Sequence, residues 1–282
     1  MPATGTVAEA LQSSIDALAA AGVETPRLDA ELLLAEATGR DRAALAADSG
    51  EGIEAADARA FGAMVRRRIV REPVSYILGR RGFRHLELRS DGRALIPRPE
   101  TELLVEVAVG MQPASVLDAG TGSGAIALAL ADELPEAEIV AIDVSRSALA
   151  LAEENAAELG QGDRVRFQLG ALPAPRHFEL VVANLPYVRD ADWTLLAPEI
   201  TKFEPRGALL GGEDGLDPIR GLLAALSPGS KPARAGLASD AVALEVGEGQ
   251  SGEVAELMVA AGFAATETHR DLAGIERMVL GR

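Results

Sequence analysis

The sequence predicts an α/β protein: a mostly parallel sheet covered by helices on both faces, preceded by a helical bundle and a β-hairpin linker. Three observations predict this fold. Short apolar stretches alternate with amphipathic ones from about residue 97 onward, amphipathic stretches alone fill the first seventy or so residues, and hydrophobic residues make up 48% of the 282 residues. Alternation of this kind is typical of parallel sheets, and the apolar content is enough for a sizeable core.

Residues 1–73 are predicted to form the helical bundle. Thr6 and Glu9 have the spacing of a capping box at the start of a helix. Thr25 followed by Pro26 is typical of an N-cap with proline in the first helical position. A further amphipathic stretch ends before Pro73, so three helices account for most of this domain.

Residues 74–96 are predicted to be a linker that contains a β-hairpin. Leu86 and Leu88 alternate with polar residues, as in a half-buried strand, and Asp91-Gly92 is typical of a hairpin turn. Residues 97–282 then form the third part of the chain, the α/β domain. Its strands are expected at residues 115–118, 138–143, 165–169, 180–183, 241–246 and 277–280. Its helices are expected at residues 125–133, 145–159, 216–226 and 252–261.

Composition excludes several classes of site. The chain has no cysteine, so disulfides and thiolate metal sites are excluded, and its three histidines lie far apart in sequence. We therefore expect no metal. No apolar run approaches the roughly 20 residues that span a bilayer, and residues 1–11 do not resemble a signal peptide. We expect a cytoplasmic monomer that does not bind membranes.

Charge argues against a nucleic-acid partner. The formal net charge is −16, and nonspecific binding of nucleic acids needs a basic face. One segment has the opposite charge, because ten arginines lie between Arg66 and Arg98. Two interpretations stay open for this arginine-rich segment: a solvated helix face and hairpin, which we favour, or a docking patch for an acidic protein or RNA.

A glycine-rich loop follows the first predicted strand of the α/β domain. Its residues are Gly120-Thr121-Gly122-Ser123-Gly124, directly before a helix. Glycines there let the backbone turn tightly and approach a ligand closely, and ligands of such sheets bind at the carboxyl ends of the strands. The alternative is an ordinary tight turn. The spacing is neither that of the dinucleotide fingerprint nor that of a P-loop.

The second predicted strand ends in Asp143, about 20 residues after the glycine-rich loop. A carboxylate at this position accepts hydrogen bonds from both hydroxyls of a ribose. The alternative is that Asp143 merely caps the next helix. Glycine loop and aspartate together predict a site for a nucleoside cofactor, but they do not distinguish NAD from S-adenosylmethionine.

The sequence Asn184-Leu185-Pro186-Tyr187 directly follows the fourth predicted strand. An amide nitrogen is a poor nucleophile because its lone pair is delocalised. The Asn184 side-chain oxygen and the Leu185 carbonyl could each accept one N–H of such a group and hold the nitrogen in line with a methyl donor. Pro186 would stiffen the loop and Tyr187 would stack on the planar target. The alternative is a strand-ending turn, but the position after a strand favours function.

Several motifs then show a family resemblance. They are the residues 72–79 (EPVSYILG), 95–102 (LIPRPETE), 203–205 (FEP), 211–216 (GGEDGL), 244–247 (LEVG) with Gln250, and 271–274 (DLAG). With the glycine loop, Asp143 and Asn184–Tyr187, they cover about residues 72–282. The chain resembles the HemK/PrmC family, which methylates the glutamine of the Gly-Gly-Gln motif in class-1 peptide chain release factors.

The resemblance implies a class I methyltransferase domain, which is Rossmann-like, and a helical domain that recognises the release factor. It implies that Gly120–Gly124 and Asp143 hold S-adenosylmethionine, with Asn184 beside the methyl donor, and that Asn184–Tyr187 bind the glutamine side chain. Two departures accompany it. Leu185 stands where the family usually has a first proline, and Gly170-Ala171-Leu172 replaces a segment that commonly has an acidic residue for the adenine amino group. Leu172 then offers only apolar contact to the ring.

Two other functions remain as alternatives. Leu185 and the arginine-rich segment would also suit an RNA or DNA methyltransferase that acts on an exocyclic base nitrogen. A non-catalytic scaffold that binds the cofactor is the third hypothesis, supported only by the missing acidic residue near Ala171.

Overall fold

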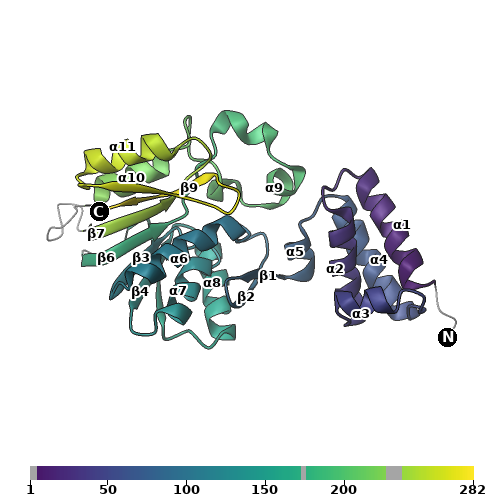
Figure 1. Cartoon of the computed structure of the whole chain (residues 1–282). Coiled ribbons are helices and arrows are strands. Elements are labelled where there is room, and N and C mark those ends of the chain that lie inside the picture. Colours follow the sequence, from purple (N-terminus) through teal and green to yellow (C-terminus); the bar gives the residue numbers. More distant parts are fainter. Residues whose placement is uncertain (1–4, 173–175, 227–236) are drawn as a thin grey trace. The chain divides into compact units, whose positions relative to one another are not determined.

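The structure is a computed structural model that describes residues 5–172, 176–226 and 237–282 (Figure 1). Its contacts divide the chain into two compact units. The helical unit comprises Met1–Gly79 with Ala197–Phe203, and the sheet unit comprises Arg80–Leu196 with Glu204–Arg282. The division into three domains that the sequence suggested stays a prediction, and the contacts group the hairpin residues with the sheet.

The helical unit is built on one apolar core. Leu33, Phe61 and Val65 are buried in this core, which lies between the longer helices. The predicted capping box is confirmed, since Thr6 and Glu9 each bond the other's backbone N–H. The helices of this unit are α1 Val7–Ala20, α2 Pro26–Thr38, α3 Arg42–Ala47, α4 Ala55–Ile69, α5 Val74–Leu78 and α9 Pro198–Phe203.

Helix α9 lies 120 residues downstream of α5 in the chain but packs in the helical unit through charged side chains. Arg68 is 6% exposed and donates to Asp29 Oδ2 at 2.7 Å, and it lies 2.8 Å from Glu199 Oε1. Arg71 donates to both oxygens of Glu199 at 2.6 and 2.7 Å. Since removing one partner of a buried ion pair leaves an uncompensated charge, these four side chains hold α9 firmly against α2 and α4.

The sheet unit has seven strands in the order β5-β4-β3-β6-β7-β9-β8. The first five are parallel, and β9 pairs antiparallel with both β7 and β8. The predicted mostly parallel sheet is therefore confirmed. Its strands are β3 Ser115–Ala119, β4 Glu138–Asp143, β5 Val165–Leu169, β6 Arg176–Ala183, β7 Leu237–Glu245, β8 Thr266–Arg270 and β9 Glu276–Gly281.

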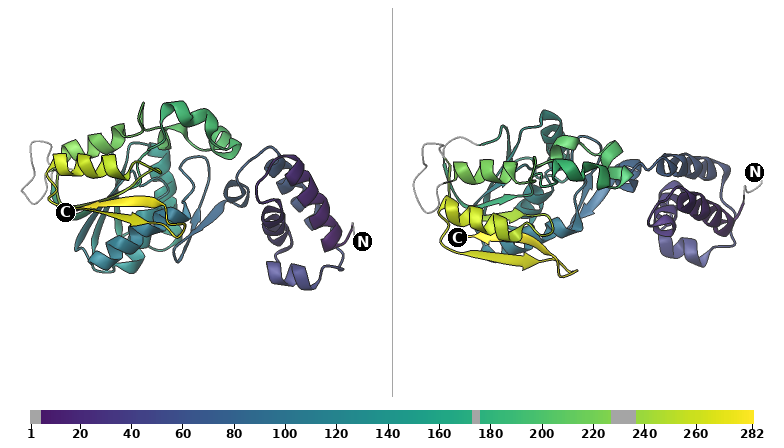
Figure 2. Two further views of the ribbon diagram at one scale, coloured as in Figure 1. Left: turned by 45° about the horizontal axis from the view of Figure 1, so that its top comes forward. Right: turned by 90° about the horizontal axis from the view of Figure 1, so that it is seen from above.

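Alternate side chains of the central strands enter two apolar cores. Val116 and Val182 pack with α6, α7 and α8, whereas Leu117 and Val181 pack with α10 and α11. Figure 1 shows these two helical layers, and both views of Figure 2 show α10 and α11 side by side. The helices are α6 Glu102–Met111, α7 Ala125–Glu133, α8 Arg146–Glu158, α10 Asp217–Ala225 and α11 Ser251–Ala261, with the 3-10 turns η1 Pro99–Thr101, η2 Asp190–Leu195 and η3 Arg206–Ala208.

The β-hairpin is present, but its predicted turn is wrong. Strands β1 Arg80–Phe83 and β2 Leu86–Arg89 pair antiparallel, so the chain reverses at Arg84, which has φ +52°, and not at Asp91-Gly92. The buried Asn155 joins the hairpin to the glycine loop. Its Oδ1 accepts from the Arg89 N–H at 2.7 Å, and its Nδ2 donates to the Ser123 carbonyl at 2.9 Å.

Candidate functional site

A cavity of about 630 Å³ lies in the sheet unit where β3, β4 and β6 end. Its size is in the range of small-molecule sites. In the sheet, β4 and β5 lie on one side of β3 and β6 lies on the other, so the strand order reverses at β3. Ligands of open α/β sheets bind where the strand order reverses. Most of the residues that the sequence singled out line this cavity: Gly120, Thr121, Gly122, Ser123, Asp143, Leu172, Asn184, Leu185 and Pro186.

The glycine loop is tied to the end of β4. The N–H groups of Gly120 and Thr121 both donate to the Ile142 carbonyl at 2.9 Å. Gly120 has φ +79°, and a Cβ built on it would lie 3.0 Å from Leu185 Cδ2. The left-handed backbone at this position favours glycine, and any other residue would also press on the Leu185 side chain. Gly124 is not among the lining residues, and the space its Cβ would need is taken by Ala152 and Leu128.

Asp143 is held by main-chain donors. Its Oδ2 accepts from the Gly122 N–H at 2.9 Å, and its Oδ1 accepts from the Ser145 N–H at 2.7 Å. A carboxylate has about four acceptor positions, so these two bonds fix its orientation and leave capacity for a ligand. The alternative, in which Asp143 caps the next helix, is wrong, because the N-cap of α8 is Ser145, whose hydroxyl accepts from the Ala148 N–H.

A second acidic residue lies under the glycine loop. Asp118 is fully buried, and its Oδ2 accepts from the Thr121 hydroxyl at 2.6 Å and from the Ala127 N–H at 3.2 Å. Burial raises the pKa of this carboxyl to about 7. Its Oδ1 has no hydrogen-bond partner among the described residues, so Asp118 retains an acceptor directly beside the loop.

Asn184 is oriented by a residue that sequence reasoning did not single out. Its Nδ2 donates to the Thr101 hydroxyl at 3.0 Å. Thr101 ends η1, is 4% exposed, and lines the cavity with Asn184. Because the NH2 of Asn184 is engaged, its Oδ1 is the end left to accept a hydrogen bond from a ligand.

Tyr187 differs from its three neighbours in the motif, because it is not among the residues that line the cavity. Its hydroxyl donates to Oε1 of Glu245 at 3.3 Å. Burial raises the pKa of Tyr187, so the phenol keeps its proton. The stacking of Tyr187 on a planar target stays a prediction.

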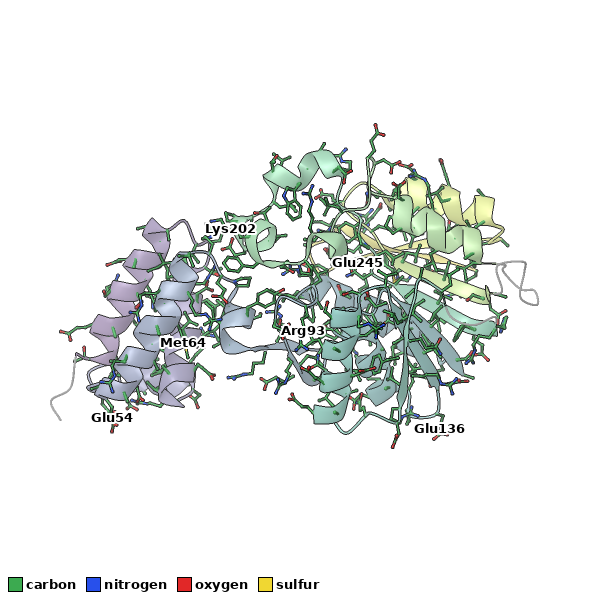
Figure 3. All side chains as sticks on the ribbon, turned by 180° about the vertical axis from the view of Figure 1, so that it is seen from behind. Glu54, Met64, Arg93, Glu136, Lys202 and Glu245 are labelled. Carbon is green, nitrogen blue, oxygen red and sulfur yellow. The ribbon has the colours of Figure 1, made fainter. Side chains whose placement is uncertain are left out.

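Glu245, labelled in Figure 3, is the last residue of β7 and is 3% exposed. Burial raises its pKa to about 7, and hydrogen bonding by Thr101 and Tyr187 lowers it. Its Oε2 has no partner that meets hydrogen-bond geometry among the described residues. A buried strand that ends in an acidic residue was the sequence signal that could have found this group.

The loop at residues 209–215 contacts the backbone at the end of the Asn184–Tyr187 motif. The Val188 N–H donates to the Leu209 carbonyl, and the Gly211 N–H donates to the Val188 carbonyl, both at 2.9 Å. A Cβ built on Gly215 would lie 2.3 Å from the Tyr187 carbonyl oxygen. Gln250 Nε2 donates to that same oxygen at 3.1 Å. These contacts give a physical reason for the glycines at 211–215 and fix the backbone of the motif.

A buried glutamate holds another part of the cavity wall in place. Glu204 accepts from the Ile96 N–H at 3.1 Å and forms an ion pair with Arg98. Its side chain is 1% exposed, and both Ile96 and Arg98 line the cavity. Residues 95–102 and 203–205 were noted in the sequence as motifs, and this contact shows why they occur together.

Most arginines of the arginine-rich segment form ion pairs within their own unit. In the sheet unit Arg84 donates to both oxygens of Glu133, and Arg93 donates to both oxygens of Glu154. These bonds attach the hairpin region to α7 and α8. The arginines of this segment that pair with acidic side chains are Arg67, Arg68, Arg71, Arg80, Arg84, Arg89, Arg93 and Arg98. Most of its charge is therefore neutralised within the protein.

Within residues 5–172, 176–226 and 237–282, no helix is long and apolar enough to cross a membrane. The same residues contain no group of three or more histidine or acidic side chains placed to hold a metal ion.

Comparison with protein families divides the chain much as its contacts do. Residues 9–79 match the model described as the PrmC N-terminal domain, and residues 116–203 match the model described as a methyltransferase domain.

Three curated relatives share the name release factor glutamine methyltransferase. That of Rhodospirillum rubrum is 41% identical, over 94% of this chain and 81% of its own. That of Geobacter sulfurreducens is 39% identical, over 100% of this chain and 98% of its own. That of Bordetella pertussis is 42% identical, over 90% and 93%. Similarity at this level extends over both units.

Solved structures share the architecture of the chain at low identity. The hMettl16 catalytic domain, in complex with MAT2A 3'UTR hairpin 6, has a TM-score of 0.55 and 13% identity, over 77% of this chain and 81% of that one. A methyltransferase from Pyrococcus furiosus has a TM-score of 0.50 and 15% identity, over 70% and 88%. Likeness at this identity shows the fold alone, and it confirms the predicted class I methyltransferase fold.

Proposed function

Because the chain belongs to the family of release factor glutamine methyltransferases, we propose that it transfers a methyl group from S-adenosylmethionine to the side-chain amide nitrogen of a release-factor glutamine. The substrate is the glutamine of the Gly-Gly-Gln motif in class-1 peptide chain release factors. One observation carries the proposal beyond the family: the Asn184 amide is anchored by its NH2 end at the cavity wall, which leaves an oxygen to accept the N–H of another amide.

The residues of the cavity fit the cofactor. Asp143 has acceptor capacity for two ribose hydroxyls, and its orientation is fixed by two main-chain N–H groups. The glycine loop brings the backbone close to the ligand without side chains in the way. Ala171 and Leu172 line the part of the cavity beyond Asp143 and offer apolar contact to the adenine. When bound, S-adenosylmethionine supplies an electrophilic methyl group on a sulfonium centre.

The substrate amide is oriented by two acceptors. Asn184 Oδ1 and the Leu185 carbonyl each accept one N–H of the glutamine side chain. These bonds point the nitrogen lone pair at the methyl group and favour a tetrahedral nitrogen, which the transition state needs more than the ground state does. Methyl transfer to the nitrogen would break the bond between the methyl group and the sulfonium sulfur, leave S-adenosylhomocysteine as a neutral thioether, and release one proton from the nitrogen to solvent. Leucine at position 185 keeps this role intact, because the acceptor is a main-chain carbonyl.

The helical unit is proposed to recognise the body of the release factor, and the whole chain to act as a cytoplasmic monomer. Such a division leaves the sheet unit free to position one glutamine. Size-exclusion chromatography with light scattering, with and without a purified release factor, would test the stoichiometry. A stable dimer of the chain alone would contradict the monomer.

The experiment that tests the function compares substrates. The enzyme is incubated with labelled S-adenosylmethionine and either a purified class-1 release factor, the same factor with its Gly-Gly-Gln glutamine replaced by alanine, or naked RNA. We expect label only in the unaltered release factor. Label in RNA but not in the factor would favour the exocyclic base nitrogen as target. Tight cofactor binding by calorimetry with no transfer to any substrate would favour the scaffold.

A further inference from the structure

We propose that Glu245, acting through Thr101, is a positioning residue that determines which end of the Asn184 amide faces the cavity. The inference deepens the proposed function, because it concerns the acceptor that would bind the substrate amide. It rests on three buried or half-buried side chains that come from η1, the end of β6 and the end of β7.

The three side chains form a connected series. Asn184 Nδ2 is 3.0 Å from Thr101 Oγ1, and the Thr101 hydroxyl is a neighbour of the Glu245 carboxyl that lowers its pKa by hydrogen bonding. Glu245 Oε2 has no partner that meets hydrogen-bond geometry among the described residues, Thr101 included. A buried carboxylate oxygen without a donor is costly, so the Thr101 proton has a clear destination.

The hydrogen bonds of the series can run in only one direction, because each group has a limited number of protons to donate. A threonine hydroxyl carries one proton, and an ionised carboxylate only accepts. When Glu245 is ionised, it accepts a hydrogen bond from the Thr101 hydroxyl. Thr101 Oγ1 can then only accept a hydrogen bond from its other neighbour. The group that Asn184 turns toward Thr101 must therefore be NH2. The carbonyl oxygen of Asn184 is thereby the end that a ligand meets.

The direction matters because the two ends of an asparagine amide have nearly the same shape. If the amide were reversed, its NH2 would face the NH2 of the substrate, and two donors cannot bond each other. Protonated Glu245 permits that reversal, since it can donate to Thr101 and release the Thr101 proton toward Asn184. Ionised Glu245 excludes it.

The charged groups around Glu245 set the pH at which this occurs. Burial raises its pKa to about 7, and the nearby Glu100 adds to the rise. The Thr101 and Tyr187 hydroxyls and the Arg277 guanidinium lower it. Since the ionised form is the active one, turnover should rise with pH through about 7 and fall on the acid side.

The test compares four variants in the full chain. Thr101→Val removes the hydroxyl but keeps the shape of the side chain, and Thr101→Ser keeps the hydroxyl. Glu245→Gln removes the charge at constant size. Glu133→Gln is the matched control, because Glu133 pairs with Arg84 and does not line the cavity. For each, kcat and KM for a release factor, the Kd of S-adenosylmethionine and the pH profile of kcat are measured.

We expect Thr101→Val and Glu245→Gln to lower kcat by about 10- to 100-fold, as misplaced catalytic groups commonly do, with the cofactor Kd unchanged. Thr101→Ser should restore most of the loss, and the acid limb near pH 7 should disappear in Glu245→Gln and persist in Glu133→Gln. A purely structural role would lower kcat by loss of folded protein and leave the pH profile of the remaining enzyme as in the wild type, which would overturn the proposal.

A second measurement does not depend on turnover. The side-chain NH2 signal of Asn184 in a proton–nitrogen correlation spectrum, identified by its absence in Asn184→Asp, should shift with pH around 7. It should not shift in Glu245→Gln or Thr101→Val. If the wild type transfers no methyl to a release factor yet shows this shift, the proposed function fails and the positioning role stands. If methyl is transferred and the signal is flat across that range, the positioning role is refuted.

Discussion

The two halves of the cavity are built in different ways. The half proposed for the cofactor consists mainly of backbone: the glycine loop, the Ile142 carbonyl and the main-chain donors that hold Asp143. The half proposed for the substrate depends more on side chains, since Thr101 orients Asn184, with the Leu185 carbonyl as its main-chain acceptor. Substitutions in the first half should therefore act on binding of the cofactor, and substitutions in the second half should act on turnover.

The largest effect is expected at Asn184. Asn184→Ala removes an acceptor that is used most strongly in the transition state, so kcat should fall by about 10²- to 10³-fold. Steady-state assays with a release factor check this, and calorimetry should show an almost unchanged Kd for S-adenosylmethionine. Near-normal turnover would show that Asn184 does not hold the substrate.

Asp143→Ala tests the cofactor half. Because hydrogen bonds to a charged acceptor are lost, the Kd of S-adenosylmethionine should rise by about 10- to 100-fold. The kcat at saturating cofactor should change much less. The Gly122 and Ser145 N–H groups also lose their acceptor, so Asp143→Asn is the milder companion variant. An unaltered Kd in both would reject the ribose assignment.

Gly215→Ala tests the bracing of the substrate half. Gly215 has φ +83°, and its new Cβ would collide with the Tyr187 carbonyl. We expect the free energy of unfolding to fall by about 1–3 kcal/mol and kcat to fall by roughly tenfold because the motif shifts. Gly252→Ala in α11 is the control, since a Cβ there meets nothing within 4 Å. Equal behaviour of the two variants in chemical denaturation would contradict the collision.

The pH dependence of stability distinguishes two buried glutamates in the described part of the sheet unit. Glu204 is paired with Arg98, whereas Glu245 accepts from the Tyr187 hydroxyl and has its pKa raised to about 7. Between its ordinary value of 4.5 and about 7, folded protein binds this proton more tightly than unfolded protein does. The free energy of unfolding should thus decrease as pH rises through this range, by about 1 kcal/mol per unit of raised pKa.

Glu245→Gln should remove its own share of that decrease and leave the share of Asp118, whose pKa is also raised to about 7. Glu204→Gln should keep the whole decrease while lowering stability at every pH, because Arg98 loses its partner. Urea titrations at several pH values between about 5 and 8 compare them. A pH dependence in Glu245→Gln as steep as that of the wild type would contradict the share assigned to Glu245.

The sequence predicted short segments, contiguous along the chain, that line the cavity. Residues 120–123, Asp143 and 184–186 lie at or directly after the end of a strand of the parallel sheet, and parallel strands bring their carboxyl ends together. Most of the strand and helix positions of the sheet unit followed from the same periodicity. The link from Asn184 through Thr101 to Glu245 could not be predicted this way, because its members lie in three distant segments and meet only in the folded chain.

Other features were missed for local reasons. Strand β8, Thr266–Arg270, is mostly exposed and polar, so it lacks the apolar signal of the strands beside it. Helix α9 has six residues, and its place in the helical unit depends on Glu199 meeting Arg68 and Arg71. The hairpin turn was placed at Asp91-Gly92 because that dipeptide favours left-handed backbone, but the observed turn puts Arg84 in that conformation.

The most direct test locates the transferred methyl group. Tandem mass spectrometry of a class-1 release factor, after incubation with S-adenosylmethionine and either the wild type or Asn184→Ala, identifies the modified atom. The account predicts one methyl group on the side-chain nitrogen of the Gly-Gly-Gln glutamine with the wild type and little or none with the variant. A methyl group on another residue, or equal modification by the two enzymes, would contradict it.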